Sequence, residues 1–249
     1  MSRHTPFPPE PVRVPVMRHR WAAISFLHWP YPAAEIQRLL PDGLEVEPWD
    51  GQAWVGLVPF EMTVRPPVGP GSMQFPETNV RTYVVGPDGR PGVFFFSLDA
   101  ASATAVTTAR ASWQLPYFLS RMSVEHSGNA VRYLSARRRP GPAGAGHDLT
   151  VVPGSPIAHP DEFTHYLTAR FTLWNTVAGA VMRTQADHPP WDLHQADVRD
   201  LREDLLAAAG LPAPVGAPFV HFSTGVDVRI GAPRPVSRSA PSPEDAAAS

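Results

Sequence analysis

The stretch FPETNVRTYV, residues 75–84, decides the fold that we expect for this chain. Within it Asn79, Arg81 and Tyr83 alternate with valine and threonine residues, so the polar groups with hydrogen-bonding heads share one face. This period of two predicts a β-strand over residues 77–85 with one chemically active face. The surrounding elements decide whether that face looks into the protein or out to water.

Turns and further strand patterns lie on both sides of this segment. A Pro- and Gly-rich loop of lid length precedes it at residues 65–76, and a turn follows it at residues 86–92. Residues 93–98 predict a strand buried on both faces, and the Ala-rich residues 100–113 predict a central helix. Further strands are expected at residues 21–30, 44–47, 53–62, 121–126, 130–137 and 220–230, and further helices at residues 33–40, 161–171 and 198–209.

Length and composition favour one large domain. The chain has 249 residues, 43% of them hydrophobic, which is enough to build a sizeable core. We expect a Pro-rich arm at residues 1–20, a single domain at residues 21–231 and a disordered tail at residues 232–249.

The formal charge of −2 provides no basic face for nucleic acid. No apolar run reaches the ~18 residues of a membrane span, and no signal-peptide pattern is present, so a cytoplasmic protein is expected. The oligomeric state stays open, a homo-oligomer included.

Two residue types are missing, and both absences limit the chemistry. Without cysteine the chain has no disulfides, thiolate nucleophiles or cysteine-bound zinc. All 21 basic residues are arginine, which a GC-rich codon bias would explain without reference to function. Whatever the origin of this bias, no lysine amine is available to form a Schiff base.

Several long strings occur in order along the chain and together resemble one family. They are FLHWPYPAAEIQRLLPDGLEVEPWDGQAWVGLVPFEM at residues 26–62, FPETNVRTYV at residues 75–84, GRPGVFFFSLDA at residues 89–100, AR and LPYF at Arg110 and Leu115, and HFSTGVDV at residues 221–228. On these strings the chain resembles the YqjF-like family, domain of unknown function 2071, from about residue 21 to residue 231. The family has no settled activity.

That family is similar in turn to the acetoacetate decarboxylase superfamily. The resemblance implies an α+β fold: a strongly curved antiparallel sheet, barrel-like, closing around a small-molecule pocket, with a few peripheral helices and one central helix. In the decarboxylase a Gly-Phe-Pro-Lys-Lys signature supplies the Schiff-base lysine. The equivalent stretch here is QLPYF at residues 114–118, after Arg110, and Tyr117 stands in the place of the nucleophile. Iminium chemistry is therefore excluded. The resemblance still implies a pocket, an acid at Glu77 and an arginine that binds a carboxylate or enolate oxygen.

Three residues are candidates for catalysis. Glu77 is the best general acid or base, because burial beside aromatic walls would raise its pKa toward neutrality. Arg81 is the best clamp for an oxyanion or carboxylate, since its fork can donate two hydrogen bonds. Tyr117 could donate a proton to an enolate or only pack. Alternation alone is more usual for a solvated sheet face, and the resemblance and the adjoining loop favour a site.

Five further residues are candidates for substrate binding. Asn79 and Tyr83 share the face of Glu77 and Arg81. Arg110 could reach the same pocket, cap the helix or pair with Asp99 in a buried ion pair. His28 and Trp29 end the first expected strand, where a histidine is either a hydrogen-bonded structural group or a base.

The remaining polar residues suggest no cofactor and no metal. The string DHPPWDLH at residues 187–194 contains two histidines, but its spacing fits no known ligand set, and the other histidines are scattered. Neither Ser97 nor Ser223 has the glycine flanks of a nucleophile elbow.

Three classes of function stay open on this sequence. The first is a metal-free small-molecule enzyme, a lyase, isomerase or cyclase, that uses acid–base chemistry on a carbonyl- or carboxylate-bearing substrate without a Schiff base. The alternative is a non-catalytic carrier or sensor whose barrel encloses a small apolar ligand. The third is a structural or interaction protein with a filled interior.

Overall fold

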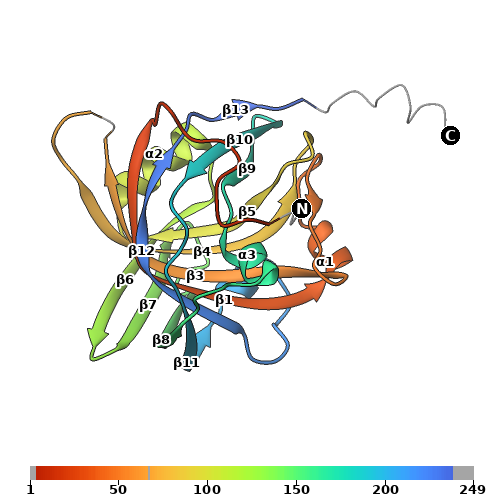
Figure 1. The fold of residues 1–249 in the computed structure, drawn as a ribbon. Helices are drawn as coiled ribbons and strands as arrows, with labels where there is room; N and C mark the ends of the chain where they lie inside the picture. Colours follow the sequence, from red (N-terminus) through yellow and green to blue (C-terminus); the bar gives the residue numbers. More distant parts are fainter. Residues whose placement is uncertain (1–3, 67, 238–249) are drawn as a thin grey trace.

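Strand pairing closes the sheet of this protein on itself twice. The computed structural model describes residues 4–66 and 68–237. Its helices are α1 (Ala33–Gln37), α2 (Ala103–Trp113), α3 (Glu162–Thr168) and α4 (Leu205–Ala208). Its strands are β1 (Met17–Pro32), β2 (Glu45–Val46), β3 (Gln52–Arg65), β4 (Met73–Val85), β5 (Pro91–Ala100), β6 (Tyr117–Ser127), β7 (Ala130–Arg139), β8 (Gly146–Pro156), β9 (Thr172–Val177), β10 (Ala180–Asp187), β11 (Leu193–Glu203), β12 (Phe219–Ile230) and β13 (Arg234–Pro235) (Figure 1).

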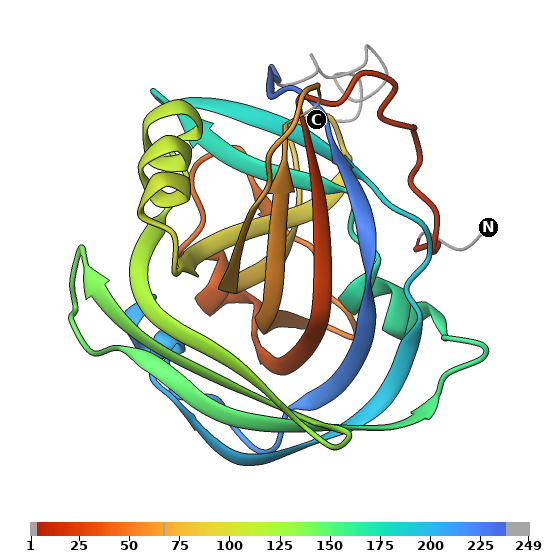
Figure 2. The same cartoon turned by 90° about the vertical axis from the view of Figure 1, so that its left-hand side faces the viewer.

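The pairings form two closed rings that share the wall β12-β1-β3-β4-β5. In the first ring, the wall continues through β9 and β10 and returns to β12. In the second, it continues through β6, β7, β8 and β11 and again returns to β12. We call the first the cavity ring and the second the core ring. Figure 2 shows β6 and β7, in green, curving around one side of the shared red and orange strands. Because β5 pairs in parallel with β6 and β9, the barrel is mixed rather than wholly antiparallel.

A bulge in β1 decides which of its residues face which ring. Ala23 has a φ of +44°, and the pairing of β1 with β3 shifts register between Ala22 and Leu27. Before this point the odd-numbered Trp21 faces the cavity ring, and after it the even-numbered Ile24 does. Such an extra residue reverses the alternation of a strand, so the two halves of β1 present opposite parities to each ring.

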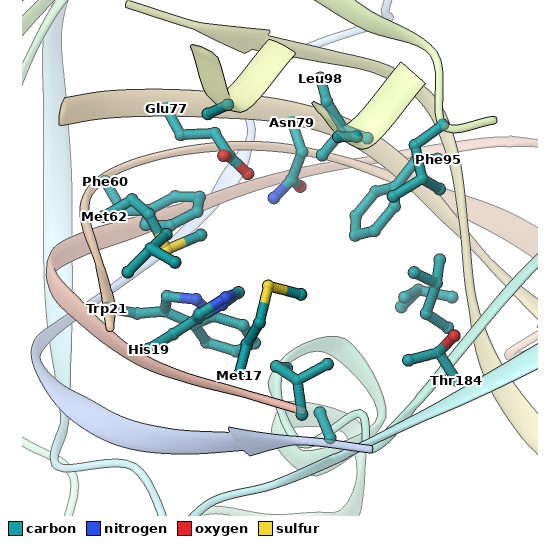
Figure 3. Close-up of a pocket in the computed structure, with 18 of the residues that line it drawn as sticks. Met17, His19, Trp21, Phe60, Met62, Glu77, Asn79, Phe95, Leu98 and Thr184 are labelled. Atoms are coloured by element: carbon teal, nitrogen blue, oxygen red, sulfur yellow. The ribbon is translucent and has the colours of Figure 1, made fainter. Parts of the chain in front are cut away.

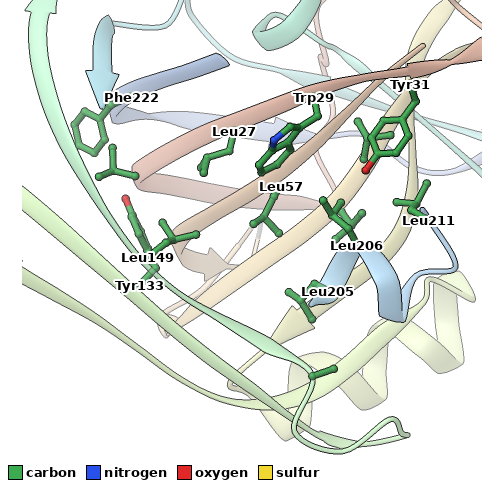
Figure 4. Close-up of a cluster of buried hydrophobic side chains, with 14 of the residues drawn as sticks. Leu27, Trp29, Tyr31, Leu57, Tyr133, Leu149, Leu205, Leu206, Leu211 and Phe222 are labelled. Atoms are coloured by element: carbon green, nitrogen blue, oxygen red, sulfur yellow. The ribbon is translucent and has the colours of Figure 1, made fainter. Parts of the chain in front are cut away.

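The core ring is filled with apolar side chains. Leu27 and Trp29 of β1 and Leu57 of β3 pack with Leu205 and Leu206 of α4, as Figure 4 shows. The walls opposite are supplied by β7 and β8. Each fully buried side chain of this size contributes roughly 1.5–3 kcal/mol to folding, so burial of this cluster strongly favours the folded state.

Helix α2 forms where the Ala-rich stretch predicts it, but it does not lie at the centre of the molecule. Ser102 caps it by accepting a hydrogen bond from the Ala105 amide at 3.2 Å, and Gln114 ends it with a φ of +49°. Only Val106 of this helix is buried. The helix covers one end of the cavity ring from outside, and the expectation of a central helix is therefore wrong.

Two other local expectations are also wrong. Residues 198–209, expected as one helix, divide between β11 and the short α4, because β11 is held by long-range pairing with β8. The run Val93–Leu98 is not buried on both faces throughout, since Phe94, Phe95 and Phe96 are only half-buried. By contrast, Asp161 is the N-cap of α3 as predicted, accepting from the Thr164 amide at 2.7 Å.

Candidate active site

The cavity ring encloses a cavity of about 240 Å³. Its walls come from alternate residues of β1, β3, β4, β5 and β10, and helix α2 closes one end. Most of the lining is apolar, and it includes the aromatic and methionine side chains labelled in the close-up of Figure 3. The apolar lining includes Met17, Trp21, Ile24, Phe60, Met62, Val64, Met73, Phe75, Val93, Phe95, Leu98, Trp113, Leu115, Trp191 and Ile230. The polar lining consists of His19, Glu77, Asn79, Arg81, Thr108, Tyr117, Thr168, Arg170, Thr172 and Thr184.

Strand β4 turns its polar face into this cavity. Glu77, Asn79 and Arg81 all line it, and Glu77 and Asn79 point into the same space in Figure 3. Thr78 and Val80, on the other face, pack toward the core ring. The face predicted from the period of two is therefore turned inward, away from solvent.

Glu77 and Tyr117 are joined by a hydrogen bond inside the cavity. The Tyr117 hydroxyl donates to Oε2 of Glu77 at 3.0 Å, and only 3% of Glu77 is exposed. Burial raises the pKa of Glu77 to about 8, the Tyr117 hydrogen bond opposes this rise, and the charge of Asp99 adds to it. Burial, together with the neighbouring Glu77, raises the pKa of Tyr117 well above its usual value. Near neutral pH both groups therefore hold their protons.

The other buried carboxylates have cationic partners. Asp99 accepts two hydrogen bonds from Arg137, at 2.9 and 2.7 Å, and a third from Ser120 at 2.6 Å. Glu47 pairs with Arg170 at 2.7 Å. Within the described residues, no basic side chain lies within 4.0 Å of Glu77. An acid buried without a cation keeps its proton, which is the state that a general acid requires.

Two buried arginines line the cavity. Arg81 is 8% exposed, its Nη2 donates to the Leu167 carbonyl at 3.1 Å, and its Nε has no hydrogen-bond partner in the described chain. Arg170 is 7% exposed and commits Nε to the Tyr166 carbonyl and Nη1 to Glu47, while its Nη2 has no partner among the same residues. Both guanidinium groups lie against the ring of Tyr83, at 5.8 and 4.7 Å. Each therefore has an N–H available to a ligand.

Sequence reasoning missed His19, Trp21, Arg170 and Thr184 as cavity residues. Both His19 ring nitrogens, Nε1 of Trp21 and Oγ1 of Thr184 are buried without a partner in the described part of the chain. Burial lowers the pKa of His19 to about 4, so the ring is neutral and can donate or accept. The alternation of Met17, His19 and Trp21 with Arg18 and Arg20 was an available signal, but β1 begins four residues before the expected strand.

Four of the predicted binding residues lie outside the cavity lining. His28 is buried and its Nε2 lies 2.6 Å from the hydroxyl of Tyr83, which itself donates to the Leu167 carbonyl. Trp29 belongs to the core ring, on the opposite face of β1. Arg110 is exposed and donates to the backbone carbonyl of Tyr117 at 2.7 Å. The expected pair between Arg110 and Asp99 is wrong, because Arg137 occupies both carboxylate oxygens.

Among residues 4–66 and 68–237, no three His, Cys, Asp or Glu side chains are grouped as a metal site. None of the helices in the described chain combines the length and the apolar character needed to cross a membrane.

Comparison with known proteins supplies the family. The model of DUF2071, described as an uncharacterized conserved protein, matches residues 18–227. The chain belongs to this family. The uncharacterized protein YqjF of Bacillus subtilis (strain 168) is 35% identical over 217 residues, which cover 86% of this chain and 89% of YqjF. The predicted resemblance to the YqjF-like family is therefore confirmed.

Solved structures similar to this DUF2071 protein have the acetoacetate decarboxylase-like fold. The enduracididine biosynthesis enzyme MppR, complexed with pyruvate, gives a TM-score of 0.65 at 13% identity over 90% of this chain and 91% of MppR. Acetoacetate decarboxylase from Legionella pneumophila gives 0.61 at 15% identity over 92% of each chain. At such identities the likeness establishes the fold, and it confirms the predicted fold class.

Proposed function

We propose that this DUF2071 protein is a small-molecule enzyme that moves protons on a carbonyl- or carboxylate-bearing substrate without a Schiff base. The observation that supports this most strongly is the hydrogen bond of 3.0 Å that Tyr117 donates to the buried Glu77 in the cavity, with no basic side chain within 4.0 Å of Glu77 among the described residues. A lyase, an isomerase and a cyclase would all use such a pair. The MppR structures, with pyruvate and with its condensation product with imidazole 4-carboxaldehyde, concern small carbonyl compounds on the same fold.

Glu77 is the proton carrier in this proposal. With a pKa of about 8, it donates a proton near neutrality and accepts one from a carbon next to a carbonyl at higher pH. Tyr117 remains protonated throughout this range and donates a hydrogen bond, either to Glu77 or to an enolate oxygen. No lysine is present, so the enolate itself must be stabilised by these donors.

Asn79 and Arg81 set the orientation of the substrate. They follow Glu77 at two-residue intervals on one face of β4, which places their Cα atoms about 7 and 13 Å away along the strand. Arg81 holds a carboxylate at its unpartnered Nε, and Asn79 lies between the acid and the anchor. A substrate that reaches both ends is thereby fixed with its carbonyl group beside Glu77.

Exchange of substrate C–H protons with solvent tests this function directly. Pyruvate, levulinate and 4-phenyl-2-oxobutanoate in D₂O would be followed by proton NMR for loss of the signal next to the carbonyl. We expect catalysed exchange of at least one compound, rising with pH through about 8. Glu77→Gln should reduce the rate by about 10²-fold or more, whereas Glu125→Gln, an exposed acid on β6, should not change it. Equal rates in the two variants would sink the proposal.

The alternative is a carrier or sensor, and the mainly apolar cavity lining favours it. It predicts saturable binding without exchange or product. Binding strength would then depend on Trp21 and Phe60 more than on Glu77.

A further inference from the structure

The charges of the side chains around the cavity favour a ligand with one anionic group. Arg81 is always protonated, is more than nine-tenths buried, and has no carboxylate within 4.0 Å in the described chain. Glu47 balances Arg170, and Glu77 is neutral near pH 7 because burial raises its pKa to about 8. A buried cation without a countercharge is strongly unfavourable, and the hydrogen bond of Arg81 to the Leu167 carbonyl supplies no negative charge. A ligand anion supplies one.

The side chains that form the cavity walls favour a ligand whose larger part is apolar; we call this part the apolar body. Trp21 stacks on Trp191, with ring centroids 6.2 Å apart and planes 18° from parallel, and Phe60 meets Trp21 edge-on at 6.1 Å. Met17 and Met62 lie beside them and can adapt to different shapes. A short keto acid would leave most of this surface without contact, and each uncontacted wall forfeits dispersion energy.

The size of the cavity sets the size of the ligand. An apolar protein cavity of about 150 Å³ holds benzene, which has six non-hydrogen atoms. By proportion, the 240 Å³ here accommodate a ligand of about ten non-hydrogen atoms. This is larger than pyruvate and is close to a benzene ring that carries a three-carbon acid.

We propose that the ligand is a hydrophobic monocarboxylate of this size, with its carboxylate on the free N–H groups of Arg81 and Arg170 and its aryl or alkyl body against Trp21, Trp191 and Phe60. The inference rests on the proposed function for the position of the reacting carbonyl, beside Glu77. It adds the substrate class, which separates this site from one built for short polar keto acids.

Three probes that differ in one property each test the proposal by calorimetry on the full chain. They are 3-phenylpropanoate, propanoate, which lacks the ring, and 3-phenylpropan-1-ol, which lacks the charge. We expect 3-phenylpropanoate to bind at least tenfold more tightly than either of the others. If propanoate binds with the same affinity as 3-phenylpropanoate, the proposed apolar contacts are wrong. If 3-phenylpropan-1-ol binds with that affinity, the proposed anion site is wrong.

Substitutions then locate the two contacts. Arg81→Gln should weaken 3-phenylpropanoate at least tenfold and leave the alcohol unchanged, while Arg121→Gln, an exposed arginine on β6, should affect neither. Trp21→Leu should weaken both ring-bearing probes. If Arg81→Gln binds 3-phenylpropanoate like the unsubstituted protein, the proposed anchor is wrong; if this variant does not fold, the three-probe series on the unsubstituted chain still decides.

Failure of this inference and failure of the enzyme proposal give different results. Binding of 3-phenylpropanoate needs no turnover, and Glu77→Gln should retain it within threefold. A protein that binds this probe selectively but exchanges no C–H protons supports the ligand class and contradicts the enzyme. A protein that catalyses proton exchange on pyruvate but gains no affinity from the phenyl ring supports the enzyme and contradicts the ligand class.

Discussion

The two rings share five strands, yet one is filled with side chains and the other encloses a cavity. Leu57 of β3 faces the filled core ring, while Phe60 and Met62 of the same strand face the cavity. The rings also treat charge differently: Asp99 has a full set of partners on the core side, whereas Glu77 and Arg81 on the cavity side have no countercharge among the described residues. In the core ring the buried acid Asp99 has its cation, whereas the acid and the cation that line the cavity ring are left for a ligand.

The largest difference in the free energy of unfolding is expected between variants in which one arginine of each ring is replaced. Arg137→Gln leaves Asp99 buried without its cation and should destabilise the protein by about 3–5 kcal/mol. Arg81→Gln removes a buried cation without a carboxylate partner, so it should change stability by less than about 1 kcal/mol, or increase it. Urea unfolding of both variants at pH 7 measures this difference. Equal losses would mean that Arg81 has a structural role.

Two leucines provide a matched test of packing. Leu57 is fully buried in the core ring, and Leu98, 2% exposed, lies on the cavity wall. Leu57→Ala should cost about 4 kcal/mol and Leu98→Ala about 2, because the side chain of Leu98 already lacks neighbours on one side. If chemical denaturation gives the same loss for both, the cavity ring is as closely packed as the core ring.

The pH dependence of stability isolates Glu77. Its pKa is raised from 4.5 to about 8 in the folded protein, so the folded state holds a proton that the unfolded state has released between these values. The stability contributed by Glu77 is therefore fully present below pH 4.5 and is lost as pH rises toward 8. Relative to Glu77→Gln, the unsubstituted protein should lose at least about 1.4 kcal/mol across this interval, which corresponds to one pKa unit. Parallel stability curves for the two proteins would contradict a buried, protonated acid.

The smallest effect is expected at Arg110. The sequence made it a binding candidate, but its side chain is exposed and donates a hydrogen bond to the backbone carbonyl of Tyr117. Arg110→Ala should change stability by no more than about 0.5 kcal/mol and ligand affinity by less than twofold. A tenfold loss of 3-phenylpropanoate binding would place it in the site after all.

The sequence predicted one face of the site much better than the other. The alternation in β4, joined to the family resemblance, predicted that Glu77 and Arg81 face a cavity, and the resemblance offered Tyr117 as either a proton donor or a packing residue. The hydrogen bond between Tyr117 and Glu77 spans 40 residues. His28 and Trp29 could not be placed the same way, because the bulge at Ala23 reverses the parity of β1 and the local sequence Ala22-Ala23 carries no glycine to mark it. Arg170 was missed because its position depends on a pairing with Glu47 across 123 residues.

Strand β11 shows the same limit for secondary structure. The sequence VRDLREDLLAAA at residues 198–209 has strong helix formers, and only its last residues form the short α4. The rest pairs with β8 and closes the core ring. Local propensity could not reveal that partner, because tertiary pairing decides between helix and strand for such a segment.

The protonation state of Glu77 decides whether the cavity ring holds a buried acid. Carbon-13 NMR of protein labelled at the glutamate carboxyl carbons, titrated from pH 4 to pH 10, gives its apparent pKa, and the spectrum of Glu77→Gln identifies the signal. We expect a midpoint near 8, which should move higher in Tyr117→Phe because the Tyr117 hydrogen bond opposes the effect of burial. A midpoint near 4.5 would show that the carboxyl is solvated and that the cavity ring holds no buried acid.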